Sequence, residues 1–302
     1  MAGEDQLCKE LIQAFPASFV RLVWPGVAKQ IDLGAVDFRQ EEYFTDSPRD
    51  GRLRRPDLTT KVPVLAGGEV ILHGEIEAKY LSARVPGIIE YNRLLGLRHG
   101  LEVHTAVLYC RGGPPGLRRQ KFELKSLGQT VTVIHYVSLG LSRMSATELL
   151  TRREPLAWAF AALARPGDIG SRAELRVVCL RRIVASQDLA EVQRSLLFNF
   201  VASYIESDRG VSEEYDELFQ RKDNREVQET MITWAEKMEA RGYERGRRET
   251  MALLARQITR KFGPLSEWVQ QTIESVDAEQ LLEWGDRFVT ARTVEEVFDG
   301  KG

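Results

Sequence analysis

Residues 57–80, "DLTTKVPVLAGGEVILHGEIEAKY", carry the clearest structural signal in the chain. Two runs in which polar and apolar residues alternate flank the pair Gly67-Gly68, a pattern typical of two antiparallel strands joined by a tight turn. Pro63 has no backbone N–H to donate within a sheet, so the first strand is expected at an edge or at a bulge. The stretch therefore predicts a β-hairpin at the edge of a sheet.

Three further segments extend this hairpin into a larger core. Residues 84–99 have the apolar spacing of a helix, and Gly100 follows them as a typical C-terminal cap. Residues 103–110 and 131–139 are rich in β-branched and aromatic residues, and we interpret the basic, Gly/Pro-containing segment between them as a loop. The order strand, strand, helix, strand, strand predicts a mixed sheet with at least one parallel crossover.

Helical patterns flank this core on both sides. Residues 5–30 have apolar positions at helical spacing, interrupted at Pro16 and Pro25, and no strand is predicted after residue 144. We therefore expect an α/β (α+β) core over residues 1–144 and a helical extension over residues 145–240. A small helical C-terminal domain is expected over residues 241–302, beginning at the charged segment 241–248.

Composition narrows the classes of protein that the chain can belong to. The longest apolar run, residues 155–164, is shorter than the ~18 to 20 residues that cross a bilayer, and the N-terminus is too charged for a signal peptide. We expect a cytoplasmic protein with no membrane partner. Cys8, Cys110 and Cys179 have no CxxC spacing, which predicts reduced core thiols. A net charge of −2 means that a nucleic acid would have to be met by a local basic patch.

Alternation places four polar side chains on one face of the second strand: His73, Glu75, Glu77 and Lys79. A solvent-exposed strand face is the ordinary explanation of such a pattern. Carboxylate oxygens beside a lysine are also the groups that hold Mg²⁺ or Mn²⁺ against a phosphate and orient a water. The first strand decides between these alternatives through Asp57.

The register of the hairpin determines where Asp57 lies. A three-residue loop, Ala66 to Gly68, would place Asp57 opposite Glu77 and on the same face. A two-residue Gly-Gly loop would place it opposite Ala78, on the other face. A three-residue or bulged loop is therefore a structural prediction of the metal-site hypothesis.

Asp57 and the triplet Glu77-Ala78-Lys79 resemble the motif of the PD-(D/E)xK nuclease superfamily, and Pro56 completes its "PD". The chain is similar, more closely, to the bacterial recombination-promoting nuclease (transposase-like) family in the segments "FVRLVWPGVAKQIDL", "EEYFTD", "RRPDLTTKVPV", "GEIEAKY", "EYNRLLGLRHGL" and "TAVLY". Residues 241–298 are similar to a small domain of unknown function that often follows this core. The resemblance covers nearly the whole chain. It implies a restriction-endonuclease-like fold and a Mg²⁺-dependent DNA endonuclease linked to recombination or transposition.

The resemblance also implies roles for individual residues. Asp57 and Glu77 would ligate Mg²⁺ or Mn²⁺, the Ala78 carbonyl would complete the coordination, and Lys79 would position the attacking water or stabilise charge on the phosphate. Many relatives have Gln in place of Lys79, so this lysine matches the wider superfamily and favours an intact site.

Three other residues of the region have two interpretations each. Glu42 is a further candidate metal ligand, with Glu41 beside it, and a surface carboxylate is the alternative. Glu75 either supports the metal ligands without binding the ion itself or is exposed to solvent. His73 is expected to be a hydrogen-bonded strand histidine more than a ligand.

Two basic segments flank the candidate site, and Arg54, Arg55, Arg118 and Arg119 are the candidate DNA-binding residues within them. Such residues would neutralise phosphates without reading base sequence, although solvated loops carry the same charges. The alternative function is therefore a catalytically inactive nuclease fold that binds DNA or a protein. Both a monomer and a homodimer are compatible with the sequence.

Overall fold

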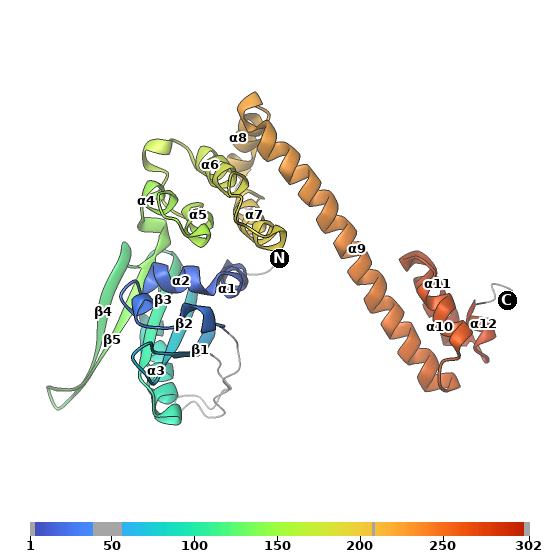
Figure 1. Cartoon of the computed structure of the whole chain (residues 1–302), viewed down its shortest axis with the longest axis horizontal. Helices are drawn as coiled ribbons and strands as arrows, with labels where there is room; N and C mark the ends of the chain where they lie inside the picture. Colours follow the sequence, from blue (N-terminus) through green and yellow to red (C-terminus); the bar gives the residue numbers. More distant parts are fainter. Residues whose placement is uncertain (1–3, 39–55, 207–208, 299–302) are drawn as a thin grey trace. The chain divides into compact units, whose positions relative to one another are not determined.

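A computed structural model of the chain describes residues 4–38, 56–206 and 209–298 (Figure 1). The chain divides into two compact units, residues 1–228 and residues 229–302. The first unit contains a mixed five-stranded sheet together with helices, which confirms the α/β class. No helix in the described ranges is long and apolar enough to span a membrane.

The sheet has the strand order β1-β2-β3-β5-β4. Its strands are β1 (Leu58–Pro63), β2 (Glu69–Lys79), β3 (Val103–Arg111), β4 (Gly116–Ser126) and β5 (Gln129–Gly140). The pairs β1/β2 and β4/β5 are antiparallel, whereas β2/β3 and β3/β5 are parallel. Helix α3 (Val85–His99) makes the predicted crossover from β2 to β3 and ends at Gly100, whose φ of 64° suits a glycine C-cap.

The β1–β2 loop has the predicted length at a shifted position. The Val64 amide donates to the Gly68 carbonyl at 3.0 Å, so the loop consists of residues 65–67 and not of residues 66–68. Gly67 has a φ of 104°, a backbone conformation that side chains with a Cβ rarely adopt. The glycine therefore fixes where the turn closes, one residue earlier than predicted.

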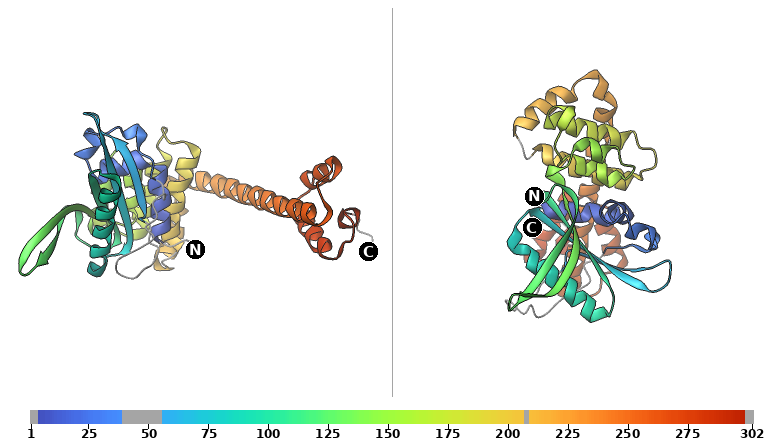
Figure 2. Two further views of the ribbon diagram at one scale, coloured as in Figure 1. Left: turned by 90° about the horizontal axis from the view of Figure 1, so that it is seen from below. Right: turned by 90° about the vertical axis from the view of Figure 1, so that its left-hand side faces the viewer.

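The segment predicted as a loop between the last two strands is strand β4. It pairs with β5 along its whole length, whereas β5 pairs with β3 only over residues 137–140. The rest of the β4–β5 hairpin is a two-stranded ribbon that projects from the sheet (Figure 2). The loop prediction was wrong because no side chain of β4 is buried, and alternation of apolar residues arises only where one strand face is buried.

Helices cover both faces of the sheet. On one face, α1 (Glu4–Ala14) and α2 (Pro16–Val23) pack so closely that a Cβ at Gly74 would lie 3.5 Å from the Phe19 ring. Cys8 of α1 and Cys110 of β3, both fully buried, bring their sulfurs to 3.4 Å on this face. On the other face, Ile88 of α3 packs in a cluster with residues of β3. None of the three cysteines is in a disulfide and all are buried, as predicted.

The first unit continues as helices packed beside α1 and α2. These helices are α4 (Ala146–Leu150), α5 (Pro155–Ala161), α6 (Arg172–Val184), α7 (Glu191–Glu206) and α8 (Arg209–Phe219). Short 3₁₀ turns are η1 (Val27–Lys29), η2 (Leu33–Ala35), η3 (Ser82–Arg84), η4 (Leu141–Arg143), η5 (Gly167–Ile169) and η6 (Lys222–Asn224). A capping box between Ser171 and Glu174 begins α6, which satisfies backbone N–H groups at that end.

The second unit is formed by the greater part of α9 (Arg225–Phe262) with α10 (Glu267–Glu274), α11 (Ala278–Thr290) and α12 (Glu295–Phe298). Its core is apolar: Leu254, Ile258, Val269, Ile273, Leu281, Trp284, Ala291 and Val297. The expected boundary segment 241–248 lies inside α9. The three domain ranges given by the sequence stay predictions.

Gly140 offers a test of the packing at the end of β5. A Cβ at this position would collide with the Pro114 carbonyl oxygen, a backbone atom that cannot rotate away. We expect Gly140→Ala to lower the free energy of unfolding by about 1–3 kcal/mol, measured by urea denaturation. Gly26→Ala is the control, because nothing lies within 4 Å of a Cβ there. Equal stability of the two variants would contradict the described packing.

Candidate active site

The hairpin register brings Asp57 next to the polar face of β2. Leu58 pairs with Gly74, and one more step of this register places Asp57 level with Glu75. The expectation that Asp57 lies opposite Glu77 was wrong by two residues, because the loop closes one residue earlier. A shift of two keeps the face unchanged, since side chains alternate with a period of two. Glu75 and Glu77 share one face of β2, and Asp57, which directly precedes β1, lies beside them: its amide donates to Glu75 Oε1 at 3.4 Å.

Asp57 is held by two groups. Its Oδ2 accepts a hydrogen bond from the Ile76 amide at 2.9 Å, and its Oδ1 lies 2.7 Å from Lys9 Nζ of α1. Burial alone would lower the pKa of Lys9. The hydrogen bond to Asp57 and the negative charges of Asp57, Asp5 and Glu75 outweigh burial, so the pKa of Lys9 is raised. Lys9 is thus a charged partner of the candidate ligand. Sequence reasoning missed it.

Glu75 belongs to a buried hydrogen-bond chain. Asn92 of α3 donates to Thr105 Oγ1 at 2.9 Å, Thr105 lies 3.0 Å from His73 Nδ1, and His73 Nε2 lies 2.8 Å from Glu75 Oε1. The Asn92 Nδ2 group can only donate, so Thr105 Oγ1 accepts from it and donates its own hydroxyl proton to His73 Nδ1. His73 then donates from Nε2 to Glu75. His73 is fully buried, in agreement with its expected structural role.

Glu77 is paired with an arginine that precedes α3. Arg84 donates from its guanidinium to Glu77 Oε2 at 2.7 Å. Burial raises the pKa of Glu77, Arg84 opposes this effect, and the charge of Asp57 adds to it. Burial likewise raises the pKa of Glu75, with Asp57 again adding and His73 opposing. The carboxylates are therefore near enough to repel one another.

Lys79 lies at the exposed end of β2, level with Arg111 of β3. Within the described part of the chain it makes no hydrogen bond or ion pair. Ala78, between Lys79 and Glu77, is half-buried. The structure thus groups the carboxylates with Lys9 and Arg84, and leaves Lys79 at the margin of the group.

The other candidates do not gather at this group. Glu42, Arg54 and Arg55 lie outside the described residues. Arg118 and Arg119 are exposed on β4, at the sheet edge opposite β1. They are strand residues, not the loop residues that were predicted.

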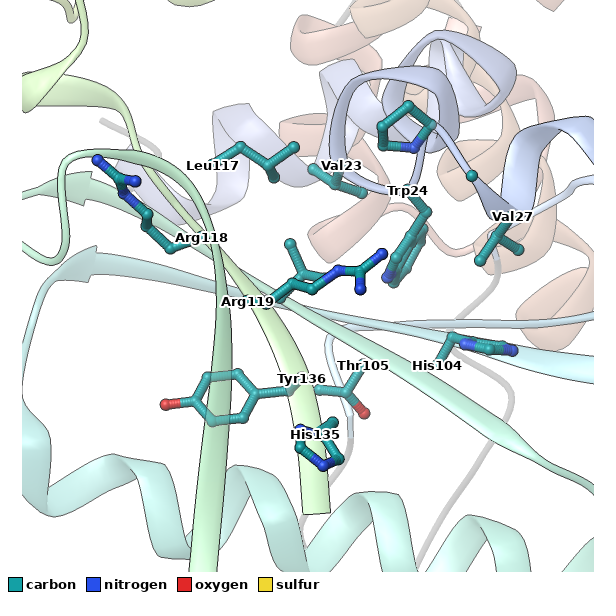
Figure 3. Close-up of a pocket in the computed structure, with 13 residues that line it drawn as sticks. Val23, Trp24, Val27, His104, Thr105, Leu117, Arg118, Arg119, His135 and Tyr136 are labelled. Carbon is teal, nitrogen blue, oxygen red and sulfur yellow. The ribbon is translucent and has the colours of Figure 1, made fainter. Parts of the chain in front are cut away.

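A pocket of about 680 Å³ lies near Arg119, between the end of α2 and strands β3, β4 and β5. Figure 3 shows the Arg119 side chain extending toward Trp24. Thr105 shares the face of His73, so its neighbour His104 faces the other way, into this pocket. Burial lowers the pKa of His104. The pocket is therefore on the face opposite the carboxylates.

The carboxylates fit a divalent cation by donor type. Hard oxygen ligands on one face are those that Mg²⁺ and Mn²⁺ prefer. In the described ranges, no group of three His, Cys, Asp or Glu side chains is arranged around a common metal position. One oxygen of Asp57 contacts Lys9, and one oxygen of Glu77 contacts Arg84. A bound ion would take over the oxygens that these cations now hold.

Comparisons with known proteins find no matching family model, no matching curated sequence and no matching solved structure.

Burial of Glu75 leads to a prediction about pH. The pKa of Glu75 is raised in the folded state. Its contribution to the free energy of unfolding is therefore fully present below the pKa of the unfolded state, near 4.5, and is lost as pH rises through the pKa of the folded state. We expect Glu75→Gln to reduce the loss of stability between pH 4.5 and neutral pH, measured by urea unfolding at each pH. Glu69→Gln, an exposed position on the same strand, is the control. Parallel pH profiles for Glu75→Gln and wild type would rule out this cause.

Proposed function

We propose that this chain is a metal-dependent nuclease that hydrolyses phosphodiester bonds of DNA, built on a restriction-endonuclease-like core. The observation that carries the proposal is the placement of Asp57 beside Glu75, which lies on the strand that also carries Glu77, at the edge hairpin of a mixed sheet. The resemblance of the sequence to the PD-(D/E)xK superfamily supports it. A link to recombination or transposition rests on that resemblance alone.

The proposal gives each residue a role. Asp57 and Glu77 would hold the ion, and the Ala78 carbonyl would be a further oxygen ligand. Mg²⁺ or Mn²⁺ supplies charge neutralisation at the phosphate and a more acidic bound water. Lys79 is free to contact a phosphate from the exposed strand end. Glu75, fixed by His73, lies next to Asp57 and positions it.

The test is a cleavage assay on the full chain with supercoiled plasmid and linear duplex DNA. Nicked or linear product in Mg²⁺ or Mn²⁺, and none in EDTA, is the expected result. Cleavage that persists in EDTA, or no cleavage with either metal, would overturn the proposal.

A specific contact favours a second function, a DNA-binding module without catalysis. Both oxygens of Asp57 are already engaged, one by Lys9 and one by the Ile76 amide. An ion pair of this kind neutralises the ligand without a metal. Calorimetric titration with Mn²⁺ separates the two functions. Binding that is lost in Asp57→Asn supports the nuclease, whereas salt-dependent DNA binding without any Mn²⁺ binding supports the module.

A further inference from the structure

The β4–β5 ribbon is the part of the sheet that the proposed active site does not use. Its ladder runs from Gln120 paired with Tyr136 to Ser126 paired with Gln129, and no third strand among the described residues pairs with it. At ~3.4 Å per residue this is a projection of roughly 20 Å. Figures 1 and 2 show it extending away from the helices that cover the sheet. Such a ribbon contributes little to the core.

The tip of the ribbon carries a leucine that folding does not explain. Ser126 and Gln129 enclose the two-residue turn Leu127-Gly128. Leu127 has a φ of 50° and is the only residue other than glycine with a positive φ in the described part of the chain. Its side chain is 101% exposed. Both residues of the turn have a positive φ, and two-residue hairpin turns of this kind favour Asn or Gly at the first position. Leucine at this position therefore adds backbone strain and gains no burial.

Backbone strain at an exposed position points toward a binding role. The Leu127 side chain is neither buried nor favoured by the backbone conformation, so its apolar surface is available for contact with a binding partner. The tip therefore presents one apolar side chain at the far end of the ribbon.

The flanks of the ribbon are basic. Glu123 is the only acidic residue between residues 116 and 136. Four exposed cations lie on β4: Arg118, Arg119, Lys121 and Lys125. Glu123 lies 2.6 Å from Lys121 Nζ and 3.8 Å from Lys125 Nζ. Arg118 and Arg119 have no acidic partner in the described ranges. The whole β4–β5 hairpin, including Arg118 and Arg119 at the base of the ribbon, is thus locally positive in a chain whose net charge is −2.

We propose that the β4–β5 ribbon lies in a groove of duplex DNA, with Lys121 and Lys125 of the ribbon and Arg118 and Arg119 at its base on the phosphates, and with Leu127 inserted at a base step. A two-stranded ribbon fits a DNA groove, and apolar wedges such as leucine partly unstack base steps and bend the duplex. Charge complementarity selects a polyanion over a second copy of this acidic chain. The choice of DNA as the partner rests on the proposed nuclease function, but DNA binding by the ribbon does not require cleavage.

The test uses the full chain and a short duplex in EDTA, which prevents metal-dependent cleavage. Fluorescence anisotropy measures affinity, and energy transfer between dyes at the two DNA ends measures bending. We expect Leu127→Gly to weaken binding about five- to tenfold and to abolish bending, while thermal stability is kept or raised because glycine relieves the strain. Leu65→Gly is the matched control, since Leu65 is 70% exposed at the tip of the other hairpin.

A charge variant tests the flanks separately. Arg119→Gln should lower the slope of log K against log salt by about 1, the effect of one lost phosphate contact. An unchanged slope, or unchanged binding and bending in Leu127→Gly, overturns the proposal. A dimer that dissociates in Leu127→Gly without DNA also overturns it and identifies a second copy as the occupant.

The two proposals fail in different ways. DNA bending by the wild-type chain without cleavage in Mg²⁺ or Mn²⁺ supports the ribbon and rejects the nuclease. Cleavage that Leu127→Gly leaves unchanged, together with unchanged binding, rejects the ribbon and keeps the nuclease.

Discussion

Replacing Glu77 with Gln is expected to lower the rate of metal-dependent DNA cleavage by about 10²- to 10³-fold, the effect of losing one preorganised charged group in an active site. Gln has nearly the same shape as Glu but lacks the charge that holds a divalent ion. The rate is measured as single-turnover cleavage of a labelled duplex at saturating Mg²⁺. Glu69→Gln, an exposed change on the same strand, should cleave at the wild-type rate.

The stability of Glu77→Gln separates a functional loss from a folding defect. Burial raises the pKa of Glu77, so its charge opposes folding at neutral pH, and the neutral variant should unfold at the same or a higher temperature. A variant that is as stable as wild type and still cleaves at the wild-type rate would remove Glu77 from the site.

Lys79→Met is expected to reduce cleavage about 10²-fold, while DNA binding weakens only by the loss of one phosphate contact and stability stays close to wild type. Lys79 is exposed and has no ion pair among the described residues, so its loss should disturb no packing. The measurement is the same single-turnover rate, together with the dissociation constant for DNA in EDTA. Lys61→Met, at an exposed position of β1, is the matched control.

Lys9 provides the alternative outcome. It already contacts Asp57 at 2.7 Å, whereas Lys79 contacts none of the carboxylates. Wild-type cleavage by Lys79→Met combined with a strong loss in Lys9→Met would assign the catalytic lysine to α1 and reject the motif lysine.

Local sequence signals predicted the part of the fold that is buried. The β1–β2 hairpin, α3 and the parallel crossover follow from alternation, helical spacing and Gly100, which act within a few residues. Strand β4 was missed because its ribbon lies outside the core, where no hydrophobic pattern is required.

The candidate site could be predicted only in part for a related reason. The three-residue length of the hairpin loop was predicted, but the loop begins one residue earlier than predicted. This shift changes the residue opposite Asp57 from Glu77 to Glu75. Contacts such as Lys9 with Asp57 and Asn92 with Thr105 join separate elements. Spacing along one element carries no information about them.

The two sulfurs between α1 and β3 make the motion of the site measurable. Cys8 and Cys110 are fully buried, so a thiol reagent reaches them only when α1 separates from the sheet. Lys9 follows Cys8 on the same helix, and that separation also withdraws the lysine from Asp57. The rate of thiol labelling therefore reports how often Lys9 leaves Asp57, while Cys179, buried in α6, reports the opening of the helical region independently.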